Sequence, residues 1–102
     1  MRIDMDKIYA LMTSADFRAR FKAEYWQTKD RYEKLSAMIA KYEAGKLDFE
    51  PQCPISILKE QRSLMLELIY TLQRRAAIEG VELNEEDVTL AESESTRNIQ
   101  EG

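Results

Sequence analysis

The strongest constraint on the fold is a helical stripe of mostly apolar side chains between Ser14 and Ala44. Its members follow one another at steps of three or four residues, and they are Phe17, Phe21, Tyr25, Thr28, Tyr32, Leu35, Ile39 and Tyr42. The mean step of about 3.6 residues is that of an α-helix and is close to a coiled-coil repeat. Thr13 or Ser14 can cap the start of such a helix, and Gly45 can end it. The stripe therefore predicts one long helix over residues 14–44.

Two further helices flank the long one. Pro54 suits the first position of a helix, where its missing N–H costs nothing, and Gly80 suits the stop, which predicts a helix over residues 54–79. Its expected inward side chains are Leu58, Gln61, Met65, Leu68, Leu72 and Arg75 or Ala76. A short helix over residues 4–12 presents Met5, Ile8, Leu11 and Met12. The predicted fold class is all-α, with a short N-terminal helix followed by a long antiparallel helical hairpin.

Residues 64–72 are apolar nearly all round, because Leu64, Leu66, Ile69 and Tyr70 lie outside the expected inward stripe. A helix that is apolar on all sides must be covered on all sides, and one partner helix cannot do that. Monomers seldom leave large contiguous apolar patches in water. The pattern predicts an oligomeric helical bundle, a homo-oligomer built from dimers that could extend to a hexamer, with Ile69 in a dry interface.

Charge divides the chain into two parts. Residues 1–83 carry 14 basic and 13 acidic side chains, whereas residues 84–102 carry one basic and six acidic ones. The second part has few large aliphatic residues, too few to offset the entropy of ordering it. We therefore expect a helical hairpin domain over residues 1–83 and a flexible acidic tail over residues 84–102.

The composition argues against most enzyme classes. The 102 residues contain no His, a single Cys and three Gly, which excludes a multi-thiolate zinc site and a Gly-rich phosphate loop. Cys53 precedes Pro54 at a helix start that can lower a thiol pKa, but it has no His to act with. We expect no catalytic residues, no metal and no cofactor. No apolar run reaches the length of a signal peptide core or a membrane span, so a cytoplasmic protein is expected.

A group of cations and aromatics on the long helix is the best candidate for a binding site. Spacings of i, i+3, i+4 and i+7 place five side chains near one another, namely Arg18, Lys22, Tyr25, Trp26 and Lys29. A nucleotide needs this combination, since its base stacks on a ring and its phosphate binds Lys or Arg. The alternative is that Tyr25 belongs to the core and the cations form a solvated face.

Arg74 and Arg75 lie at the end of the predicted second long helix, where positive charge complements the helix dipole. In an antiparallel hairpin this end lies beside the start of the first long helix. The two arginines can therefore complete an anion-binding pocket with the cations there. Residues 1–83 have a net charge of only +1, which disfavours duplex nucleic acid as the ligand.

Three segments resemble small proteins encoded by phages and prophages of Gram-positive bacteria. They are residues 16–35, 42–61 and 74–83, with FEP-x-CP in the linker and the terminal IEGVEL as the most distinctive parts. In architecture the hairpin is similar to anti-CBASS and anti-Thoeris sponge proteins. That resemblance implies an oligomer in the infected host cell that sequesters a cyclic nucleotide or a cyclic ADP-ribose derivative without cleaving it. The alternative is a phage accessory or regulatory adaptor that binds a host protein through its helical surface.

Overall fold

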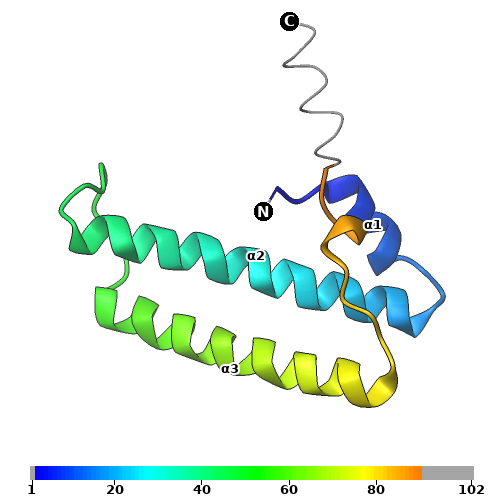
Figure 1. Ribbon diagram of the computed structural model, residues 1–102. Helices are drawn as coiled ribbons and strands as arrows, with labels where there is room; N and C mark the ends of the chain where they lie inside the picture. The colour runs from blue at the N-terminus through cyan, green and yellow to red at the C-terminus, as the bar shows by residue number, and fades with distance from the viewer. Residues whose placement is uncertain (1, 91–102) are drawn as a thin grey trace, which may run out of the picture.

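The computed structural model describes residues 2–90, and these residues are helical without an extended strand. Helix α1 comprises Met5–Met12, α2 comprises Phe17–Glu43, α3 comprises Ile55–Glu79, and a 3-10 turn comprises Glu85–Asp87. Helices α2 and α3 run antiparallel, and α1 packs on α2 near its start (Figure 1). The all-α fold with a short leading helix and a long hairpin is confirmed.

Side chains set where the helices begin. The Asp4 carboxylate accepts the Asp6 backbone N–H at 3.0 Å and caps α1, and the Asp16 carboxylate accepts the Arg18 backbone N–H at 3.0 Å and caps α2. The prediction that Thr13 or Ser14 caps the long helix is therefore wrong. Both residues belong to the turn after α1, and an acceptor closer to the first free N–H groups takes their place.

Glycines set where the long helices end. Gly45, just beyond α2, and Gly80, at the end of α3, have φ angles of 70° and 71°. This left-handed conformation is inexpensive only for a residue without a Cβ atom. The two glycine stops predicted from the sequence therefore fall where the backbone requires them.

The main core lies between the first half of α2, the second half of α3, α1 and the C-terminal segment. Its buried members are Ile8, Phe21, Tyr25, Trp26, Ile69, Leu72, Ala76, Val81 and Val88. Ile69 is 3% exposed inside this cluster, so its predicted place in an interface between copies is wrong. Leu72 and Ala76 face inward as predicted, but Gln61, Leu68 and Arg75 are exposed, because the buried face of α3 follows Met65, Ile69, Leu72 and Ala76.

Backbone bonds tie the two ends of the described chain together. Ile3 and Thr89 form an antiparallel bridge, Asp4 N donates to Val88 O at 2.7 Å, and Leu90 N donates to Arg2 O at 3.2 Å. Figure 1 shows the segment after α3 returning across α2 to the side of α1.

Side-chain contacts also hold the segment after α3 in place. Val88 is fully buried, Val81 is 7% exposed, and Lys7 Nζ donates to Thr89 O at 2.7 Å. The predicted flexible tail is therefore wrong for residues 84–90, because one buried valine and the bonds to residues 2–4 hold this stretch in place. Residues 91–102 of that predicted tail lie outside the described residues. Between residues 2 and 90, no helix combines the length and the apolar character that crossing a bilayer requires.

Candidate functional site

The two aromatic rings expected to stack on a ligand are buried. Tyr25 is 3% exposed and Trp26 is 6% exposed, and their rings meet edge to face with centroids 4.9 Å apart. Gln73 Nε2 donates to Tyr25 Oη at 2.9 Å, which satisfies the phenol at the edge of the core. Neither ring offers a free face to a nucleotide base in the single chain. For Tyr25 this agrees with the alternative interpretation, in which the ring belongs to the core.

The three cations predicted beside those rings do not converge on one point. Lys22 Nζ lies 3.2 Å from Asp87 Oδ2, so it holds the C-terminal segment against α2. The Arg18 guanidinium lies 5.3 Å from the centre of the exposed Phe17 ring. Lys29 is half-buried. This side of α2 is therefore occupied in part by the chain's own acidic segment.

The antiparallel hairpin does bring the end of α3 to the first turns of α2. Arg75 lies with its guanidinium carbon 4.8 Å from the centre of the Phe21 ring, and its Nε donates to Glu79 Oε2 at 2.8 Å. The hydrogen bond that Arg75 donates to Glu79 raises the pKa of Arg75, and the Glu24 carboxylate adds to that effect from α2. Arg74 is exposed, with Nη2 3.4 Å from Thr71 Oγ1.

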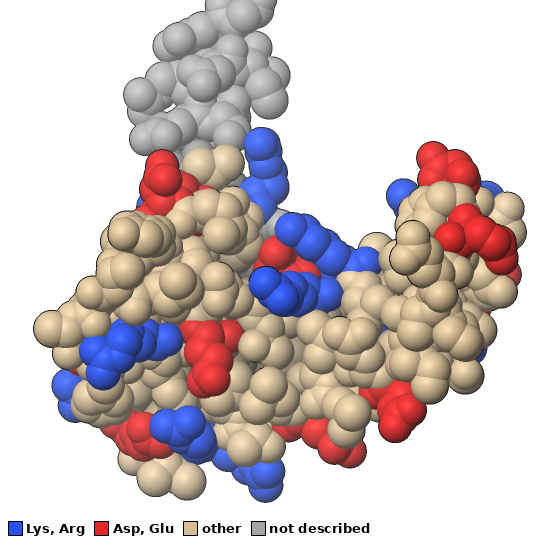
Figure 2. All heavy atoms as spheres, turned by 180° about the vertical axis from the view of Figure 1, so that it is seen from behind, with Lys and Arg blue, Asp and Glu red and all other residues tan. Residues whose placement is uncertain are grey.

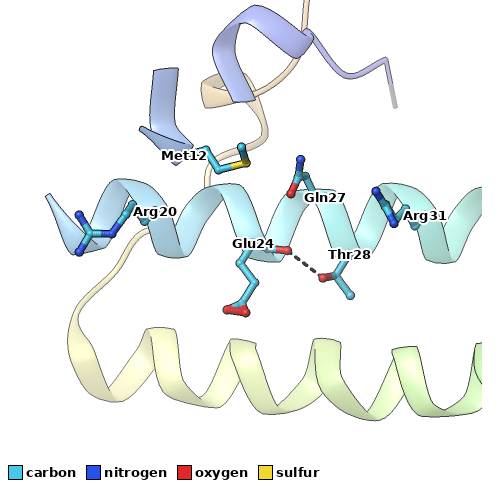
Figure 3. A pocket seen from close by; sticks show the side chains of 6 residues that line it. All are labelled: Met12, Arg20, Glu24, Gln27, Thr28 and Arg31. Atoms are coloured by element: carbon cyan, nitrogen blue, oxygen red, sulfur yellow. Dashed lines mark hydrogen bonds between the residues drawn. The ribbon is translucent and has the colours of Figure 1, made fainter. Parts of the chain in front are cut away.

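A hollow on another face of α2 offers a different set of ligand-binding groups. Its volume is about 340 Å³, and it is lined by Met12, Arg20, Glu24, Gln27, Thr28 and Arg31. In Figure 3 Gln27 and Arg31 lie on the side of α2 that Met12 approaches, whereas the Glu24 carboxylate points toward α3. A volume of this size is at the lower end of the range for small-molecule sites.

The hollow is polar at both ends and in the middle. Arg20 Nη1 donates to Ser14 O at 2.7 Å, which anchors this guanidinium beside the α1–α2 turn. Arg31 lies eleven residues further along α2, about 16.5 Å at 1.5 Å per residue. No ion pair among residues 2–90 involves either arginine. The Arg31 guanidinium and the remaining N–H groups of Arg20 are thus available to anionic groups that are well separated on one ligand.

Gln27 and Glu24 lie between the two arginines. An amide both donates and accepts, and a carboxylate accepts, so together they can bind the polar edge of a base or the hydroxyls of a ribose. Met12 adds a polarizable apolar contact from α1. The arrangement suits a ligand that carries phosphates and a sugar or base, held by hydrogen bonds instead of aromatic stacking.

None of these lining residues is aromatic, and the site predicted from the sequence lay on the face of α2 that carries Tyr25 and Trp26. Arg20, Glu24, Gln27 and Arg31 recur at steps of four, three and four, which places them on one helical stripe. In the sequence, this polar stripe of the long helix is the feature that could have indicated the hollow. The part played by Met12 could not be read from the sequence, because it depends on how α1 packs on α2.

Basic and acidic side chains are mixed over the face that Figure 2 shows. A protein that tracks a duplex needs a continuous basic surface, since its affinity comes from neutralising phosphates. The face in this view carries no such continuous basic surface.

The chain was compared with protein families, with curated proteins and with solved structures. The family model named Sequestin matches residues 15–78, a stretch that covers α2, the α2–α3 connection and nearly all of α3. It therefore includes every residue of α2 that lines the hollow. Neither the curated proteins nor the solved structures gave a match. Because the family match spans more than half of the sequence, the chain belongs to the Sequestin family.

Proposed function

We propose that this protein is a phage-encoded sponge that binds a cyclic nucleotide or cyclic ADP-ribose-type immune signal and sequesters it without cleavage. The name of its family denotes sequestration, which supports ligand capture. The observation that carries the proposal is the hollow on α2, where Arg20 and Arg31 flank a polar centre. Self-assembly into a homo-oligomer belongs to the same proposal.

The proposed mechanism is binding alone. Arg20 and Arg31 bind phosphate oxygens through paired N–H groups, and Gln27 and Glu24 bind the base edge or ribose between them. Capture lowers the free concentration of the signal, so the host receptor stays unoccupied. This requires an affinity that competes with that receptor.

Isothermal titration against cyclic dinucleotides, cyclic trinucleotides and cyclic ADP-ribose isomers tests the proposal. We expect at least one ligand with a dissociation constant below about 10 μM. The ligand released from the denatured complex should have the mass of the ligand added, because no cleavage is proposed. Failure of every compound to bind in this range, or recovery of a cleaved product, contradicts the sponge function.

Alanine variants locate the site once a ligand is found. We expect Arg20→Ala and Arg31→Ala each to weaken binding by about 1.5–3 kcal/mol, the range for hydrogen bonds to charged groups. That range is roughly a ten- to 150-fold loss of affinity. Thermal melts should barely change, since substitutions of exposed side chains usually stay within about 0.5 kcal/mol.

Lys22→Ala and Lys29→Ala are the matched controls on the same helix. Neither lysine lines the hollow, so a ligand bound there would not contact them. The affinity for the ligand should therefore stay at the parent value. If instead these two variants lose affinity, together with variants of Arg18, Arg74 and Arg75, the ligand lies on the face first predicted from the sequence. The two outcomes separate the hollow from that face within one set of titrations.

A second candidate function is a phage adaptor that binds a host protein. It is favoured by exposed apolar side chains on α3, where Leu64 is 59% exposed and Leu68 is 43% exposed. Pull-down from host lysate, followed by identification of a stoichiometric partner, tests it. A sponge needs no host protein, so a specific partner together with failure to bind any cyclic nucleotide would favour the adaptor.

A further inference from the structure

An apolar stripe runs along the side of α3 that does not face the core. Its large members are Ile57, Leu64, Leu68 and Ile78, which are 49%, 59%, 43% and 85% exposed. Together with Gln61, Thr71 and Arg75 they recur at alternating steps of four and three residues. This is the spacing of a seam between two helices in a coiled coil. We call these seven residues the α3 stripe.

One border of the α3 stripe carries charges that change sign along the helix. Glu60, Glu67 and Arg74 each stand one residue before a member of the stripe, Gln61, Leu68 and Arg75 respectively. In Figure 2 the lower edge, where α3 lies, carries blue and red side chains together at the C-terminal end and mainly red ones toward the N-terminal end. Among the ion pairs of residues 2–90, none involves Glu60, Glu67 or Arg74. These charges are therefore available to another molecule.

We propose that the α3 stripe binds a second copy of this chain, with the two α3 helices antiparallel. In that orientation Ile57 of one copy meets Ile78 of the other, Leu68 lies near the twofold axis, and Glu60 faces Arg74. A parallel pair would instead set Glu60 and Glu67 beside Met65 and Leu72 of the other copy, which leaves both carboxylates without a cation. In the antiparallel dimer the twofold axis generates the Glu60–Arg74 pair twice, and the two pairs outweigh the single approach of the two Glu67 carboxylates near the axis.

The α3 stripe would be the surface through which the self-assembly of the proposed function occurs, and this contact does not depend on ligand binding. The second copy would lie next to the hollow, because the Glu24 carboxylate that lines the hollow points toward α3 (Figure 3). The dimer and the ligand site therefore share a border without sharing the arginines that bind the ligand.

Light scattering coupled to gel filtration tests the surface. We expect the full chain to have a dimer mass or a multiple of it at about 100 μM. We expect Leu64→Lys to give a monomer with unchanged helical circular dichroism, because this side chain is exposed and the charge would be buried only in the dimer. Tyr70→Lys is the matched control and should keep the dimer mass. Tyr70 is 55% exposed, but it lies about 100° around α3 from Thr71, a member of the α3 stripe. A monomeric parent, or a Leu64→Lys variant with the parent mass, overturns the proposal.

Charge reversal tests the orientation. Glu60→Arg and Arg74→Glu should each weaken the dimer by roughly three- to tenfold, because each sets like charges against one another. The double variant restores opposite charges in an antiparallel pair, so its dissociation constant should return close to that of the parent. If neither single variant weakens the dimer, or if the double variant is as weak as the two single losses combined, the antiparallel arrangement is wrong. Ligand titrations on the same variants are independent of this result, so failure of the dimer and failure of the sponge are distinguishable.

Discussion

Replacing Ile69 by Glu is expected to unfold the chain, whereas Leu68→Glu, one residue earlier, leaves it folded. Ile69 is 3% exposed in the core between α2 and α3, and Leu68, about 100° around the same helix, is 43% exposed. An unpaired carboxylate in a dry core costs several kcal/mol, a large part of the roughly 5–15 kcal/mol that a small domain has in total. The intrinsic helix propensities of the two variants are nearly the same.

Far-UV circular dichroism with thermal melting measures both variants. We expect Ile69→Glu to lose its cooperative transition or to melt far below the parent, and Leu68→Glu to keep helical content. In light scattering Leu68→Glu should lose the dimer. If Ile69→Glu melts with the parent, the buried face of α3 is not the one that the structure gives.

Replacing Val88 by Asp is expected to detach the C-terminal segment and to destabilise the fold strongly. Val88 is fully buried among α1 and α2 side chains, and its carbonyl accepts the Asp4 backbone N–H at 2.7 Å. Burying a carboxylate there costs several kcal/mol, while Val88→Ala costs about 1–2 kcal/mol through the lost methyl groups and the cavity. Denaturant unfolding measures both losses.

Leu90→Asp provides the control for that experiment. Leu90 is 39% exposed and contributes a backbone N–H to Arg2 O, which the substitution leaves in place. Its free energy of unfolding should change by no more than about 0.5 kcal/mol. Equal losses for Val88→Asp and Leu90→Asp would mean that residues 84–90 do not form part of the core.

The helices could be predicted from the sequence because they depend on local signals. The three- and four-residue steps of the α2 stripe, the proline before α3 and the two glycine stops fix the elements without reference to the rest of the chain. The buried side of α3 was harder to predict. With apolar residues nearly all round, two faces satisfy the pattern equally, and only packing against Phe21 and Tyr25 selects Ile69 and Ala76.

The C-terminal segment and the site depended on contacts between distant parts of the chain. An acidic composition correctly describes residues 84–87 as polar, but Val88, the next residue, is enough to anchor the segment when residues 2–4 supply hydrogen-bond partners. The site predicted from the sequence lies where aromatic residues and cations coincide along α2. Those aromatic rings are part of the core, and the hollow lies on another face of α2, whose side-chain types alone do not indicate a binding site.

The bridge between Ile3 and Thr89 closes the described chain into a ring, with consequences for the order of folding. The α2–α3 hairpin joins residues of moderate separation, so its contacts cost less loop-closure entropy than those between the two ends. We expect the hairpin to form first and the end segments to dock last. The end segments should also be the first to detach in the native state, with faster amide exchange than the α2–α3 core. A circular permutant that joins residue 90 to residue 2 and opens the exposed α2–α3 connection would reverse this order, because the last contacts to form would become the most local ones.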